Sequence, residues 1–160
     1  MKIYLIALKL LLLSIFTTSF AHEYSIGDLI IDHPIARETP PGVKVGAGYF
    51  SITNNGQKED KLISAKGDFA AIIEIHSTSM ENNIMKMNEI ENGLIIPAGE
   101  TVTFKPGGLH LMFKSLLHPL IKGEKHKVIL LFEKSGEVEI TFNVEKIKVD
   151  EHSNHHKHSH

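Results

Sequence analysis

The sequence of 160 residues predicts an all-β fold, either a β-sandwich or a barrel. Short apolar stretches recur about every ten residues, and Gly, Pro and Asn separate them. No long stretch repeats its apolar residues with the period of about 3.6 that marks an amphipathic helix. The length suits one domain, since domains usually hold roughly 100–200 residues, and a hydrophobic content of 42% is ordinary for a globular protein.

The predicted strands are short runs rich in aliphatic and β-branched residues, each bounded by a turn signal. Clear turn signals are Pro40-Pro41-Gly42, Asn54-Asn55-Gly56 and Pro106-Gly107-Gly108. Residues 68–71 are expected to form at most one helical turn. In chain order, the predicted strands are residues 29–31, 46–53, 62–65, 72–76, 84–90, 101–104, 110–113, 127–132 and 138–144.

Residues 1–21 have the pattern of a secretory signal peptide. Lys2 precedes an apolar core at residues 10–16, and Ser19-Phe20-Ala21 fits the small-x-small rule for cleavage. The alternative is a membrane anchor, but the apolar stretch is shorter than the ~20 residues needed to span a bilayer. We therefore expect an exported protein with a folded domain over residues 22–149 and no membrane span after cleavage.

Residues 150–160 contain no apolar side chain, so they are predicted to form a disordered tail. Clustered imidazoles bind Cu(II), Ni(II) or Zn(II) with little geometric preference. We expect the tail to capture such metals; the alternative is a solvated tail without a function. Its histidines are His152, His155, His156, His158 and His160.

The composition excludes several classes of function. A net charge of −2 gives no basic surface for nucleic acid. The absence of cysteine excludes disulfides, cysteine zinc sites, iron–sulfur clusters, a cysteine nucleophile and the thiolate of a blue-copper electron carrier. No glycine-rich phosphate loop or nucleophile elbow is present, so we do not expect an enzyme.

Histidine and methionine lie on the same faces of two predicted strands. Alternate residues of a strand share a face, so His110 and Met112 point one way when Leu111 points into the core. By the same rule, Glu74 and His76 point away from the core if their neighbours Ile73 and Ile75 point into it. This places imidazole and thioether groups outside the core.

A third predicted strand carries Met85 and Met87 on one face. Thioether sulfur is a soft neutral ligand, and a site of two Met and two His favours Cu(I) over zinc, magnesium or calcium. Thioethers also form no disulfides in an oxidising compartment. The alternative is that these methionines fill gaps in the core, as methionine often does.

With these residues, the sequence resembles the periplasmic copper chaperones of the PCu(A)C family, which serve the dinuclear Cu-A site of cytochrome oxidase. The family signature is His, ten residues, Met, about twenty-one residues, then His-x-Met. Here ten residues separate His76 from Met87, and twenty-two separate Met87 from His110. We expect the extra residue in a loop around residues 91–99, and Met85 is the second candidate for the position of Met87.

Segments beyond the ligands carry the same resemblance, which spans residues 26–144. It implies a cupredoxin-like Greek-key β-sandwich with one exposed Cu(I) site at His76, Met87, His110 and Met112. It also implies a Gram-negative periplasm and a copper acceptor, either cytochrome c oxidase subunit II or another assembly factor. The supporting segments include Ala36-Arg37, Gly46-Ala47-Gly48-Tyr49, Asp60-Lys61-Leu62, Glu74-Ile75-His76 and Leu131-Phe132-Glu133.

Two residues outside this set have specific expected roles. If cleavage follows Ala21, the amine and imidazole of His22 could chelate Cu(II). Arg37, the only arginine, is expected to hold a loop through an ion pair with Asp60 or Glu74. The remaining histidines, His33, His118 and His126, are expected to be surface or structural residues.

Three functions remain open from the sequence. The leading one is a monomeric copper chaperone that binds and transfers Cu(I). The second is a periplasmic copper buffer or resistance protein, which would need the same site. The third is a structural or adhesive β-sandwich whose Met and His residues come together by accident.

Overall fold

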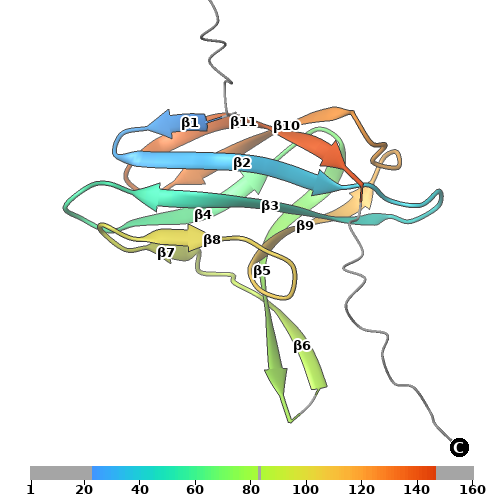
Figure 1. The fold of residues 1–160 in the computed structure, drawn as a ribbon, viewed down its shortest axis with the longest axis horizontal. Coiled ribbons are helices and arrows are strands. Elements are labelled where there is room, and N and C mark those ends of the chain that lie inside the picture. The colour runs from blue at the N-terminus through green and yellow to red at the C-terminus, as the bar shows by residue number, and fades with distance from the viewer. Residues whose placement is uncertain (1–22, 83, 147–160) are drawn as a thin grey trace, which may run out of the picture.

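The fold is all-β, as predicted. The structure is a computed structural model that describes residues 23–82 and 84–146, and every regular element in them is a strand (Figure 1). None of these residues forms a helix of the length and apolarity needed to cross a membrane. The strands are β1 (Glu23–Ile26), β2 (Leu29–Arg37), β3 (Val45–Asn54), β4 (Asp60–Lys66), β5 (Ala70–Glu81), β6 (Ile84–Glu89), β7 (Leu94–Ile96), β8 (Thr101–Thr103), β9 (His110–Leu116), β10 (Lys125–Phe132) and β11 (Gly136–Glu145).

The strands form one hydrogen-bonded sheet in the order β6-β5-β9-β3-β2-β11-β10-β4-β7, with β1 added to β2 and β8 to β3. The β11–β2 pair is parallel, and the other pairs are antiparallel. The sheet folds over on itself, because Phe142 of β11 packs edge-on against Phe50 of β3 and Phe113 of β9, each at 5.7 Å between ring centroids. Since β2 separates β11 from β3 in the sheet, these contacts cross the core. The architecture is the expected cupredoxin-like Greek-key sandwich.

All nine predicted strands are present, and two strands were missed. β1 pairs with β2 through a two-residue connection, Gly27-Asp28, in which Gly27 has a positive φ of 55°. β7 pairs with β4 and lies inside residues 91–99, which were expected to form a loop. The helical turn expected at residues 68–71 is wrong, because residues 68–69 make a turn that leads directly into β5.

Alternating burial along β3 shows how these strands make a core. Every second residue from Gly46 to Asn54 is buried, which is the period expected of a strand with one face in the core. Gly48 lies so close to the aromatic cluster that a Cβ there would be 2.6 Å from Phe113 Cζ and 2.8 Å from Phe142 Cε1. Glycine at this position lets β3 approach the two rings.

The β5–β6 hairpin projects away from the body of the sandwich (Figure 1). β5 was predicted to end at His76 but continues to Glu81. Its inner part, through His76, pairs with β9, and its outer part, from His76, pairs with β6. His76 therefore lies at the point where three strands meet, and the extension positions the methionines of β6.

Candidate metal centre

His76 and His110 lie directly opposite each other on β5 and β9. Opposite residues of an antiparallel pair share one face of the sheet, and the two ring centroids are 5.7 Å apart. Met112, two residues after His110, is opposite Glu74. Leu111 is fully buried on the other face. The face predicted for these residues is confirmed.

Hydrogen bonds determine which nitrogen of each ring carries the proton. Nδ1 of His110 lies 3.1 Å from the carbonyl oxygen of Gly108, which can only accept, so Nδ1 is protonated and Nε2 has a lone pair. Nε2 of His76 donates to Oε2 of Glu74 at 2.8 Å, which leaves the lone pair on Nδ1. That Nδ1 atom is buried and has no hydrogen-bond partner among the described residues. Each ring thus offers one nitrogen to a ligand.

Glu74 connects His76 to Lys114. Its Oε1 accepts a hydrogen bond from Lys114 Nζ at 2.8 Å, and its side chain is only 13% exposed. The bond from Lys114, followed by the bond from His76, holds the pKa of Glu74 below its usual range. Glu74 is therefore a carboxylate at neutral pH, which is the state that orients a ligating histidine through its second nitrogen.

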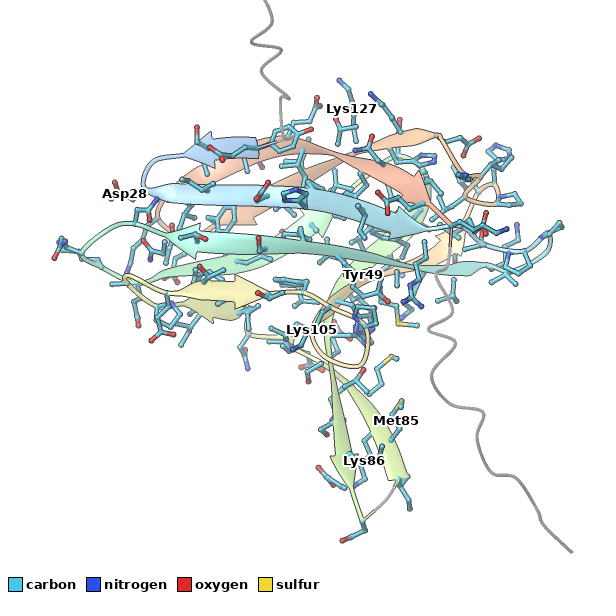
Figure 2. The ribbon with its side chains drawn as sticks, viewed as in Figure 1. Asp28, Tyr49, Met85, Lys86, Lys105 and Lys127 are labelled. Carbon is cyan, nitrogen blue, oxygen red and sulfur yellow. The ribbon has the colours of Figure 1, made fainter. Side chains whose placement is uncertain are left out.

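The methionines of β6 lie on the same face as the two histidines. Met87 is opposite Thr78, two residue pairs beyond His76, and Met85 is opposite Met80 near the hairpin tip. A hollow of about 440 Å³ is lined by Met85, Met87, His110 and Met112, together with residues of β2, β3 and the 38–43 segment. Figure 2 shows Met85 on the projecting hairpin. Of the predicted ligands in the described part of the chain, only His76 is not in this lining.

The site is less exposed at its base than expected. His110 is 6% exposed and His76 has a side-chain exposure of 11%, whereas Met87 and Met85 are 50% and 64% exposed. The turn before His110 is held against β5, because the Thr78 amide donates to the Gly108 carbonyl at 3.1 Å. The histidines therefore form a covered base, and the methionines of β6 lie at an open mouth.

A second group of ligand atoms overlaps the first and was not predicted. Glu89 of β6 is directly opposite His76, and ligand atoms of Glu74, His76 and Glu89 lie within 4.8 Å of one another. Strand parity could have found Glu89 and Lys114, since each lies two residues after a predicted ligand, Met87 and Met112. Glu74 was expected on this face from strand parity, but not as part of the site.

The role predicted for Arg37 is wrong. Its guanidinium lies 5.5 Å above the ring of Tyr49 at the edge of the hollow, and no ion pair joins it to a carboxylate of the described residues. Asp60 instead accepts hydrogen bonds from the 134–135 turn and its own neighbour, and Glu74 is held by Lys114. A planar cation above an aromatic face is the interaction that replaces the predicted ion pair.

The other histidines of the described region lie outside the hollow, as expected. His33 is exposed beside Asp32, and His118 is exposed. His126 is half-buried against Phe69 and bonded to Glu124. The predicted signal peptide and the further metal candidates lie outside the described residues; those candidates are His22, His152, His155, His156, His158 and His160.

A family model, LpqE-like, matches residues 29–144. The chain belongs to the LpqE-like family. A curated relative of this LpqE-like protein, "Putative lipoprotein Lxx21020" from Leifsonia xyli subsp. xyli, is 33% identical over 57% of this chain and 55% of its own length. The chain spans about half the length of the curated relatives it matches.

Solved structures confirm the resemblance of this LpqE-like protein to PCu(A)C domains. The copper-bound PCuAC domain from PmoF2 is 27% identical, with a TM-score of 0.67 over 79% of this chain and 99% of that domain. CuI-DR1885 from Deinococcus radiodurans is 25% identical, with a TM-score of 0.57 over 81% of this chain and 85% of that one. Both of these proteins are copper-bound.

Proposed function

We propose that this protein is an exported copper chaperone that binds one Cu(I) ion through His76, Met87, His110 and Met112. The observation that carries the proposal is the buried Nδ1 of His76, which lacks a hydrogen-bond partner among the described residues and belongs to the ring opposite His110. A buried polar atom without a partner costs free energy. A bound ion on this atom removes that cost.

The ligand set supports copper in its reduced state. Two neutral imidazole nitrogens and two thioethers suit a soft monovalent ion. Met87 is a better ligand candidate than Met85, because it lies two residue pairs from His76 along the β5–β6 hairpin, whereas Met85 lies four pairs away. The copper-bound relatives of the same fold support the same cargo.

The exposure gradient supports transfer. Met87 lies at the open mouth and the two histidines at the covered base, so an acceptor meets the thioether first. Thiolates of the acceptor would displace the weaker thioethers before the imidazoles, so that each new copper–thiolate bond replaces one bond from copper to Met or His and the ion stays Cu(I). We assign this acceptor role to the Cu-A centre of cytochrome c oxidase subunit II, reached directly or through another assembly factor in a Gram-negative periplasm. The protein would act as a monomer and not as an enzyme.

Anaerobic titration with Cu(I) against a chromogenic chelator tests the site. The wild-type protein should bind one tight equivalent, and Met87→Leu and Met112→Leu should each weaken it by at least about tenfold, since each loses one of four ligands. Met80→Leu is the matched control, because Met80 is as exposed as Met85 but lies outside the hollow lining. Equal affinity in all four proteins would exclude this ligand set.

Delivery needs a separate measurement. The copper-loaded protein is mixed with an apo Cu-A domain, and the purple absorption of the loaded acceptor is followed after oxidation. A chaperone should load this domain faster than the same concentration of a copper–chelator complex of equal affinity. A protein that retains copper under these conditions would instead be a copper buffer.

A further inference from the structure

Two different ligand sets share His76. The first is the proposed Cu(I) set, in which His76 acts with His110 and two thioethers. The second consists of the Glu74 and Glu89 carboxylates, whose oxygens lie within 4.8 Å of His76 and of each other. Glu89 faces His76 across the β5–β6 pair, and Glu74 is already bonded to its ring.

The two sets favour different metals. Carboxylate oxygens with one imidazole suit harder divalent ions, whereas thioethers with imidazoles suit Cu(I). They are also mutually exclusive, because a neutral imidazole has one lone pair. If His76 binds a divalent ion through Nε2, the ring proton moves to Nδ1. The protonated Nδ1 can then no longer bind Cu(I). Occupation of the carboxylate set would therefore block the copper site.

We propose that Lys114 determines the metal specificity of this face by holding Glu74 away from metal ions and so preventing the carboxylate set from competing for His76. This inference rests on the proposed Cu(I) site. Lys114 places its ammonium 2.8 Å from Glu74 Oε1, while His76 occupies Oε2. Both oxygens of Glu74 are thus engaged before any metal arrives.

The position of Lys114 makes it effective in this role. It lies on β9 two residues after Met112, on the face that carries the ligands, and opposite Ile72 of β5. Its ammonium lies 2.8 Å from Glu74 Oε1, and ligand atoms of Glu74 and Glu89 lie within 4.8 Å of each other. The positive charge of Lys114 therefore repels a divalent ion from this pair of carboxylates, while the neutral methionines and histidines are unaffected.

Competition between Zn(II) and Cu(I) tests the proposal in the full mature chain. Cu(I) affinity is measured with and without Zn(II) in large excess over the tail histidines, so that the tail is saturated in every variant. In the wild type, Zn(II) should change the Cu(I) affinity less than threefold. The Lys114→Met variant keeps a side chain of similar length but lacks the charge. In this variant Zn(II) should weaken Cu(I) binding by about 10–100-fold, the usual effect of a lost partner around a metal ligand.

Two variants separate specificity from a general structural effect. Lys114→Arg keeps the positive charge beside Glu74 and should behave as the wild type. Lys127→Met is the matched control, because Lys127 forms an equivalent pair with Glu139 at 2.7 Å and lies far from the Met85 hairpin (Figure 2). It should leave the Zn(II) response unchanged. The double variant Lys114→Met/Glu74→Gln should lose the Zn(II) sensitivity again.

Two results would overturn the proposal. One is a Lys114→Met protein as insensitive to Zn(II) as the wild type, and the other is a wild type as sensitive as this variant. Failure of the Cu(I) site itself would appear separately, as no tight Cu(I) binding in the absence of Zn(II). In that case direct Zn(II) titration still tests Lys114, since Lys114→Met should bind one more equivalent than the wild type.

Discussion

His76 and His110 face each other across β5 and β9, and a hydrogen bond holds the proton of each ring on one nitrogen, which leaves the lone pair on the other nitrogen. Glu74 fixes the proton of His76, and the Gly108 carbonyl fixes that of His110. The Gly108 bond depends on backbone geometry, whereas the Glu74 bond depends on one side chain. The two histidines therefore differ in how easily a substitution can disturb them.

Glu74→Gln should weaken Cu(I) binding without removing it. The amide can still accept a hydrogen bond from His76 Nε2, but the bond loses its charge, so His76 becomes a poorer donor to the metal. Loss of such a partner usually costs about 10–100-fold in metal affinity. Chelator competition measures the effect, with Glu139→Gln as the control on a remote ion pair. An unchanged affinity would show that Glu74 does not orient His76.

Met85 and Met87 should differ in their contribution to binding. Both line the hollow, but Met87 pairs with Thr78, two residues from His76, and Met85 pairs with Met80, four residues from His76. Met85→Leu should therefore lower the Cu(I) affinity less than threefold, against at least about tenfold for Met87→Leu. X-ray absorption of the copper complex provides a second measurement, since Met87→Leu should lose one copper–sulfur scatterer. The reverse order of effects would assign the ligand to Met85.

The sequence predicts which strands and which face carry the site better than it predicts how far those strands extend. Alternation alone placed Glu74, His76, His110 and Met112 on one face, because the period of two is a property of any strand. It could not show that β5 continues past His76, since the polar residues 77–79 resemble a loop. Their strand structure depends on pairing with β6.

The sequence also failed to predict interactions between residues from distant parts of the chain. The ion pair predicted for Arg37 was wrong, because nothing local in the sequence indicates that Tyr49 lies beneath its guanidinium or that Lys114 takes Glu74. β7 was missed because three residues make a weak strand signal without their partner β4. In contrast, Gly27-Asp28 between two apolar residues was a hairpin signal that the sequence did contain.

Acid should destabilise the fold partly through Asp60. Burial raises the pKa of this carboxyl, but hydrogen bonds from the Ser135 hydroxyl and the amides of Lys134, Lys61 and Ser135 outweigh it and lower the pKa. A carboxyl with a lowered folded pKa stabilises the fold above its unfolded pKa of about 3.9, and this contribution is lost as the pH falls through the folded value.

Asp60→Asn should remove part of this pH dependence and reduce the free energy of unfolding at pH 7 by about 1–3 kcal/mol, because the turn amides lose a charged acceptor. Urea unfolding at pH 7 and at pH 3, below the unfolded pKa, measures both effects. Asp68→Asn, at an exposed residue, is the control. A pH dependence identical to the wild type would rule out the role of Asp60.

Gly48→Ala should destabilise the core by about 1–3 kcal/mol, the usual cost of overpacking. The new methyl group would lie 2.6 Å from Phe113 Cζ and 2.8 Å from Phe142 Cε1, and both rings are held in the packed interior. Gly108→Ala is the control, because a Cβ there would meet its nearest atom at 3.6 Å and the carbonyl that binds His110 remains. Equal urea midpoints for the two variants would contradict the close approach of β3 to the aromatic cluster.

Removing residues 151–160 should separate the two proposed metal activities. The tail contains five histidines, which bind Cu(II) with little geometric preference, whereas the Cu(I) ligands all lie in the folded domain. The truncated protein should bind fewer Cu(II) equivalents in equilibrium dialysis and retain the Cu(I) affinity of the full chain within threefold. A variant with the same five histidines replaced by serine controls for the loss of chain length. Unchanged Cu(II) uptake in both proteins would assign Cu(II) binding to the folded domain instead of the tail.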